Sequence, residues 1–195
     1  MKQYSIGIDG NEANVYKKVG VSVYTQNLMT YFQRKSNKTL NFDIYLRNKP
    51  IKTKPAKNKY FNYKIVKGLF LWSQLFLPLN LIFNNKNDVF FSPAHYIPRF
   101  STIPTIVTIH DLSFLYYPTD FLKKDLYKLK NWTKQSIKKS KKIIAVSEST
   151  KRDIIKEAIM VMYTVMMMVN SLVTILAITK DMILEKLMAM IQVME

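Results

Sequence analysis

The sequence contains no cysteine and only two histidines, His95 and His110. The absence of thiols excludes disulfide bonds and thiolate metal sites, and two imidazoles are too few for a histidine-based structural zinc site. We therefore expect no structural metal. The first residues, M-K-Q-Y-S-I-G-I-D-G, run directly into a strand pattern and lack the apolar core of a signal peptide. This start predicts a cytoplasmic protein, with the inner face of the membrane as an alternative location.

Acidic residues are scarce: 13 Asp and Glu stand against 30 Lys and Arg, for a net charge of +17. The excess lies in residues 1–157, which hold 28 basic and 10 acidic residues. Such a charge favours polyanions, either anionic lipid headgroups or phosphorylated substrates, although an ordinary solvated basic surface is the alternative. No nucleic-acid-reading module is present, so we do not expect nucleic acid as a partner.

The hydrophobic pattern predicts an α/β fold. Short β-branched or aromatic runs indicate strands, and longer stretches with helical spacing lie between them. The predicted strands are residues 4–9, 41–46, 61–66, 88–91, 105–109 and 142–146, and the predicted helices are 21–34, 121–139 and 148–157. This alternation favours a mainly parallel, Rossmann-like sheet covered by helices.

Residues 68–83 are strongly apolar and are expected to be helical up to a break near Pro78. They are too short and too interrupted to span a bilayer. Two interpretations remain, a buried helix and an amphipathic segment on a membrane surface, and the pattern favours the buried helix.

Two ionisable residues, His110 and Asp111, follow the strand at 105–109. In open α/β sheets, ligands bind where the carboxyl ends of the strands emerge, so we interpret this pair as a candidate catalytic site. His95 follows the preceding strand and is a second candidate. The alternatives are structural: His110 as a satisfied strand-end histidine, Asp111 as a turn cap, and His95 as a loop residue.

Two helix starts are further candidates for binding. Gly20 and Val21 open a helix after the first strand, but the G-x-G-x-x-G fingerprint is absent. Gly20 either permits close approach of a phosphate or is required only for the turn. Ser147 is placed to cap the last predicted helix, and Glu148 lies where a negative charge favours the helix dipole.

The composition changes at residue 158. Nine of the eleven methionines lie in residues 160–194, and residues 158–179 carry no charge. We therefore divide the chain into a domain at 1–157 and an apolar tail at 158–195. Two hypotheses explain the tail. The first is a membrane span, for which the uncharged stretch is long enough. The second is translation from a shifted reading frame, because repeated GAT codons read one base later give ATG, the codon for methionine.

Three segments, in the same order, resemble the N-terminal domain of group 1 (family 4) glycosyltransferases. These are I-G-I-D-G-N-E-A-N-V-Y-K-K-V-G-V-S-V-Y-T-Q-N-L, T-I-H-D-L-S-F-L-Y-Y-P-T-D-F and K-K-I-I-A-V-S-E-S-T-K-R-D-I-I. The resemblance covers residues 4 to about 157. It implies one half of a GT-B fold, on the side that holds the acceptor of a retaining transferase. It also implies a nucleotide-sugar donor, a glycan or lipid-linked acceptor, and neither a bound metal nor a cofactor.

The resemblance extends to individual positions. Gly20 and Val21 match the glycine loop near the donor phosphates, although Ser22 stands where relatives often have a second glycine. His110 matches the cleft histidine, with Asp111 beside it to orient the imidazole or accept an acceptor hydroxyl. Ser147 and Glu148 match a cleft segment.

The donor-binding domain of the family, with its Glu-x7-Glu motif, does not fit into residues 158–195. We therefore expect this chain to be inactive alone. The alternative function is a non-catalytic membrane-associated binding protein, which would use its basic face and residues 158–179.

Overall fold

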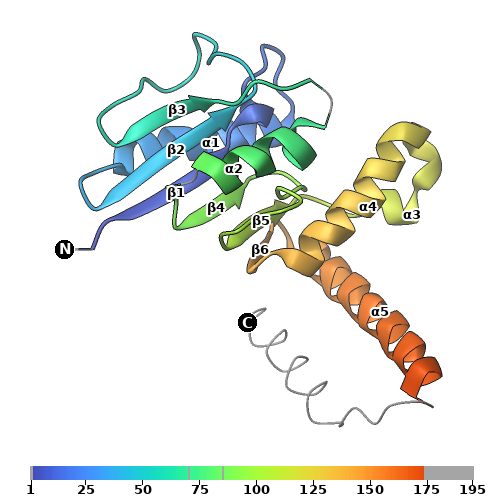
Figure 1. The fold of residues 1–195 in the computed structure, drawn as a ribbon. Coiled ribbons are helices and arrows are strands. Elements are labelled where there is room, and N and C mark those ends of the chain that lie inside the picture. The colour runs from blue at the N-terminus through green and yellow to red at the C-terminus, as the bar shows by residue number, and fades with distance from the viewer. Residues whose placement is uncertain (1, 70, 85, 174–195) are drawn as a thin grey trace.

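The computed structural model describes residues 2–69, 71–84 and 86–173, with side chains up to residue 160. Within these residues six strands form one sheet in the order β3-β2-β1-β4-β5-β6, and every neighbouring pair is parallel (Figure 1). The strands are β1 (Tyr4–Asp9), β2 (Leu40–Leu46), β3 (Phe61–Ile65), β4 (Val89–Ser92), β5 (Thr105–Ile109) and β6 (Lys142–Ala145). The predicted helix-covered parallel sheet is confirmed.

Helix α1 (Gly20–Lys35) covers one face of this sheet. Its Met29 packs with Ile8 of β1 and with Phe42 and Ile44 of β2 in a fully buried cluster. Because side chains alternate along a strand, Tyr45 points to the opposite face. There it packs with residues of the π-helical turn η2 (Trp72–Phe76) and of helix α2 (Leu77–Asn84).

Helix α4 (Lys123–Lys139) lies on the same face as α2, since its Ile137 packs with Val107 and Ile109 of β5. Three short helices lie in the connections: η1 (Asn11–Ala13), α3 (Ser113–Tyr116) and η3 (Pro118–Asp120). The last element, α5 (Glu148–Val173), contacts both β6 and α4 (Figure 1).

Two helix predictions are corrected by the structure. Pro78 does not break its helix, because the chain is helical from Trp72 to Asn84 and changes from π- to α-geometry just before the proline. Proline is tolerated in a first α-turn, where its missing N–H is not needed. The last helix does not end at residue 157 but continues to Val173, since no glycine or proline follows to terminate it.

None of the helices within the described residues has the length and apolar character needed to cross a membrane. The predicted candidate span at 158–179 extends beyond these residues.

Candidate functional site

The carboxyl ends of β1, β4 and β5 bring together residues from three parts of the sequence. The order of the strands reverses between β1 and β4, which is where open α/β sheets bind ligands. His95 follows β4 and His110 follows β5, and their ring centroids lie 5.5 Å apart. The ring of Tyr24, in α1, is edge-on to the His110 ring, and the two ring centroids lie 5.0 Å apart. Two of the predicted site residues are therefore neighbours.

The orientation of the His110 ring follows from one hydrogen bond. Its Nε2 lies 2.8 Å from the Pro93 carbonyl oxygen, and a carbonyl oxygen can only accept, so Nε2 carries the proton. In the neutral ring, Nδ1 is then an acceptor for a hydroxyl, and in the protonated ring it becomes a second donor. From the sequence, Asp111 was a candidate for orienting this ring, but in the structure the Pro93 carbonyl holds it.

The carboxylate of Asp111 is engaged locally. Its Oδ1 accepts hydrogen bonds from the backbone N–H of Ser113 at 3.0 Å and from the Ser113 hydroxyl at 2.6 Å. Burial alone would raise the pKa of Asp111, but these bonds and the nearby histidines outweigh it and lower the pKa. Asp111 is therefore an anion that caps the turn leading into α3, as the structural alternative proposed.

Thr150 connects the N-terminus of α5 to His110, a contact that the sequence pattern did not indicate. Its buried hydroxyl donates to the backbone carbonyl of His110 at 3.0 Å. Its N–H donates to the Ser147 hydroxyl at 3.1 Å, so Ser147 caps α5 as predicted. Because the Thr150 proton is committed to His110, Ser147 must be the donor in their 2.9 Å hydroxyl contact. Glu148 is exposed in the first turn of α5.

His95 is neutral at physiological pH. Burial, followed by the charge of His110, lowers the pKa of its imidazole to about 4, against a smaller opposing effect of Asp111. Its Nδ1 is buried and has no hydrogen-bond partner among the described residues. The main physical reason for the low pKa is that the charged imidazolium would lose its contact with water on burial.

Asp9 and Glu12 add two carboxyl groups to this edge, and neither was among the residues predicted from the sequence. Burial raises the pKa of Asp9 to about 7, although the Asn11 N–H donates to its Oδ1 at 3.0 Å and opposes the shift. Burial also raises the pKa of Glu12, and the charge of His110 opposes it. The strand-terminal aspartate of I-G-I-D was the available signal for Asp9. Perturbed carboxyls at a ligand-binding edge are typical of functional sites.

We expect Asp9→Asn to stabilise the protein above neutral pH. A free carboxyl titrates near 3.8 and this one near 7, so between these values the folded chain binds a proton that the unfolded chain does not. Stability therefore falls as the pH rises from about 4 to about 7, and above 7 the full cost is present. Urea unfolding at pH 8 should show that Asp9→Asn raises the free energy of unfolding by about 1–2 kcal/mol. The increase is smaller than the full pKa shift would give, because the Asp9 side chain is only half-buried and water screens part of the effect.

At pH 4 the Asp9→Asn difference should be much smaller than at pH 8, and Asp120→Asn, which replaces an exposed carboxyl elsewhere, is the control for the substitution itself. An equal gain at pH 4 and pH 8 would exclude the titration of Asp9 as its cause.

The N-terminus of α1 is open. Val19 precedes the helix without a side-chain cap, and a Cβ placed on Gly20 would meet no atom within 4 Å. Gly20 has no positive φ, so the turn itself does not require glycine. Val21 is half-buried, and Ser22, which stands where relatives often have glycine, is buried.

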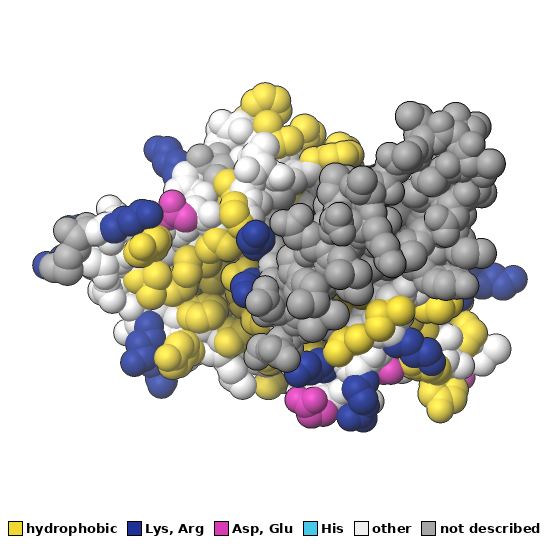
Figure 2. All heavy atoms as spheres, turned by 90° about the horizontal axis from the view of Figure 1, so that it is seen from below, with side chains coloured by type: hydrophobic (Ala, Val, Ile, Leu, Met, Phe, Trp, Pro, Cys, Tyr) yellow, Lys and Arg dark blue, Asp and Glu magenta, His cyan; other side chains and the backbone are white. Residues whose placement is uncertain are grey.

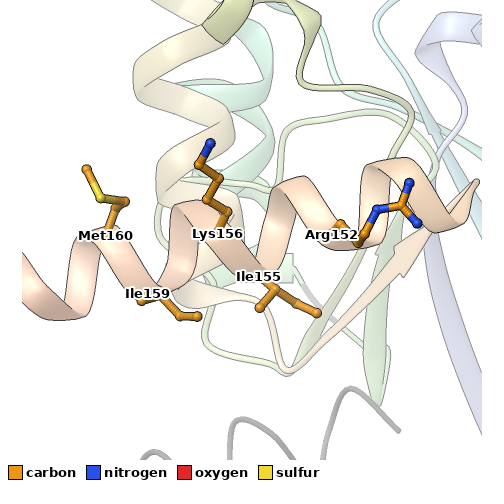
Figure 3. A pocket seen from close by; sticks show the side chains of 5 residues that line it. All are labelled: Arg152, Ile155, Lys156, Ile159 and Met160. Carbon is orange, nitrogen blue, oxygen red and sulfur yellow. The ribbon is translucent and has the colours of Figure 1, made fainter.

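No group of three or more His, Asp or Glu side chains able to hold a metal occurs in the described part of the chain. Two surface hollows lie apart from the carboxyl edge. One, of about 310 Å³, is lined by Arg152, Ile155, Lys156, Ile159 and Met160 of α5. Figure 3 shows these side chains along a single helix, with Ile155 and Ile159 pointing to one side. A second hollow is lined mainly by residues 97–105, with Ile82 of α2 on one side and residues 139–141, at the end of α4, on the other.

Comparison with known proteins gives the family. No curated protein matches the sequence. The family model for Glycosyltransferase Family 4 matches residues 19–163, which include α1, the two histidines and the start of α5. This match covers most of the chain and agrees with the parallel Rossmann-like sheet, which is consistent with half of a GT-B fold. The chain therefore belongs to glycosyltransferase family 4.

Proposed function

We propose that this chain is the acceptor-side domain of a retaining glycosyltransferase. The complete enzyme would move a sugar from a nucleotide-sugar donor to a glycan or lipid-linked acceptor. The observation that supports this best is the position of His110, which lies within the family match and whose ring is held by the Pro93 carbonyl at the ligand-binding edge of the sheet. In the reaction, the bond from the sugar to the donor phosphate breaks and a bond to the acceptor oxygen forms. The acceptor proton ends on the released phosphate.

The residues of this edge divide into three proposed roles. His110 would use Nδ1 to bind a hydroxyl of the transferred sugar when neutral, or the departing phosphate when protonated. Gly20 and Val21, at the open N-terminus of α1, would face the donor phosphates, since free N–H groups there favour anions. His95, Asp111, Ser147 and Glu148 would line the acceptor side.

A second domain would supply the remaining donor contacts, so we expect little transfer from this chain alone. We also expect no resident cofactor. The domain at 1–157 and the tail at 158–195 remain our proposed division. The family match ends at residue 163, and α5 crosses residue 158 without a break.

The gene provides the first test of the proposed function. The coding DNA after codon 157 should be translated in all three frames. A second domain with Glu-x7-Glu in another frame would support a shifted frame and assign the chain to a complete transferase. If no frame continues the family, the tail is genuine, and the membrane-associated binding protein becomes the better interpretation.

The second test is enzymatic. The chain, joined to a family 4 donor-binding domain, should release nucleotide from UDP-glucose, UDP-N-acetylglucosamine or GDP-mannose in the presence of a lipid or glycan extract. NMR of the product should show the anomeric configuration of the donor. An inverted product would contradict the retaining mechanism, and a lack of release with every donor would contradict the transferase assignment.

A further inference from the structure

The second of the two surface hollows lies at the amino ends of β5 and β6. Thr105, the first residue of β5, and Lys141, directly before β6, both line it. Its main wall is the segment 97–105, which belongs to the connection from β4 to β5. Because His110 follows the carboxyl end of β5, this hollow and the candidate site lie at opposite ends of the same strand. The volume of about 660 Å³ is in the range of small-molecule sites.

The hollow is strongly basic, and we call it the basic hollow. The described residues that line it include three cations, Arg99, Lys139 and Lys141, and no acid. All three side chains are exposed, and none forms an ion pair with another described residue. The C-terminus of α4 adds a partial negative charge of about half a unit, which three full positive charges outweigh. Seen from below, Figure 2 shows Lys and Arg along the border of a hydrophobic area, with few acidic side chains.

An aromatic ring arranges two of these cations without neutralising them. Phe100 lines the hollow and is 56% exposed. The Arg99 guanidinium lies 5.6 Å and the Lys139 ammonium 5.8 Å from the centroid of its ring. The ring attracts cations through its quadrupole, whereas a carboxylate in the same position would cancel their charge. The two cations are therefore held near each other and remain available to an anion.

The main wall of the basic hollow is anchored to α4. The Ile97 N–H donates to the buried Ser136 hydroxyl at 3.0 Å, and Gln135 Nε2 donates to the Arg99 carbonyl at 3.3 Å. Both partners lie in α4, the helix that also ends at Lys139. A wall that is already held in place lowers the entropy cost of binding a ligand.

We propose that the basic hollow binds a small organic phosphate that is free in solution. A phosphate ester carries nearly two negative charges at neutral pH, and Arg99, Lys139 and Lys141 would form charge-assisted hydrogen bonds to it. The organic part of the ligand would contact the apolar side chains of the lining, such as Ile82 and Ile103. This site does not depend on sugar transfer, so either proposal can fail without the other.

Isothermal titration calorimetry of the full chain at low ionic strength tests the proposal. We expect binding of AMP or of glucose 1-phosphate, and at least about 10-fold weaker binding of adenosine and glucose, which lack the phosphate. Lys139→Gln with Lys141→Gln should weaken the binding of the phosphate ester at least about 10-fold, because two charged donors are lost. Phe100→Leu keeps an apolar wall but removes the ring that arranges the cations, and should weaken binding about 2- to 5-fold.

The matched control is Lys123→Gln with Lys124→Gln, which removes two exposed lysines from the other end of α4 and should bind the phosphate ester as the original chain does. His110→Ala should also leave binding unchanged, which separates the basic hollow from the ligand-binding edge. Circular dichroism melts would confirm that every variant is folded. The proposal is overturned if the Lys139 and Lys141 variant binds as the original chain does, or if His110→Ala abolishes binding. It is also overturned if neither phosphate ester binds, including the case in which the chain binds only anionic vesicles or an acidic protein.

Discussion

Replacing His110 by alanine is expected to lower sugar transfer by the chain joined to a donor-binding domain about 10- to 100-fold. The imidazole is held at the ligand edge by the Pro93 carbonyl, with the Tyr24 ring beside it. Its Nδ1 would contact a sugar hydroxyl or a phosphate whose charge grows as the bond breaks. A hydrogen bond to a charged group contributes about 1.5–3 kcal/mol, which corresponds to this loss. Steady-state kinetics would measure it, with the larger part in kcat.

The conservative variant His110→Gln distinguishes this role from a structural one. A glutamine amide can donate to the Pro93 carbonyl and still present an oxygen to the ligand, so part of the activity should return. Thermal unfolding should change little in either variant, because His110 is only half-buried. Near-normal turnover of His110→Ala would exclude a role for this residue in the cleft.

Alanine substitutions at two glycines of the ligand edge should have different effects on stability. A Cβ on Gly10 would lie 2.5 Å from Ile44 Cγ2 and 3.1 Å from Leu46 Cδ2, both buried in the sheet core. Gly10→Ala should therefore lower the free energy of unfolding by about 2–3 kcal/mol through overpacking. Gly20→Ala meets no atom within 4 Å and should leave stability unchanged or raise it by up to about 1 kcal/mol, because alanine favours the helix.

Urea unfolding of the two variants under one condition would measure this contrast, and neither glycine has a positive φ that would complicate it. If Gly20 serves the donor phosphates, Gly20→Ala should raise the KM for the nucleotide-sugar while stability is kept. A destabilisation of Gly20→Ala equal to that of Gly10→Ala would mean that Gly20 serves the fold and not the ligand.

The elements of the fold could be predicted where local pattern decides them. Residues 105–109 form a strand because a β-branched run suits a buried position in a parallel sheet, and the observed bounds agree with the prediction. The predicted break near Pro78 was wrong because a proline in the first turn of a helix leaves no N–H unsatisfied. The predicted end at residue 157 was wrong because a change in composition does not by itself stop a helix.

The candidate site was predictable only in part. His110 could be predicted because it directly follows a buried strand. In a parallel sheet the carboxyl ends of all strands lie at the same edge, so a residue that follows such a strand lies at the ligand-binding edge. The Pro93 carbonyl, Thr150 and Asp9 were missed because each contributes through a contact with a residue distant in sequence, or through its burial. A backbone carbonyl, moreover, carries no sequence signal at all.

The sequence by itself determined the strand and helix order, the excess of positive charge and the family, because these depend on residue type, periodicity and motif order along the chain. Only the tertiary structure decided that His95 and His110 lie side by side, that the Pro93 carbonyl sets the tautomer of His110, and that three cations line one hollow. The physical reason is that proximity, burial and exposure arise when the sheet brings distant segments together, and a linear pattern does not specify those distances.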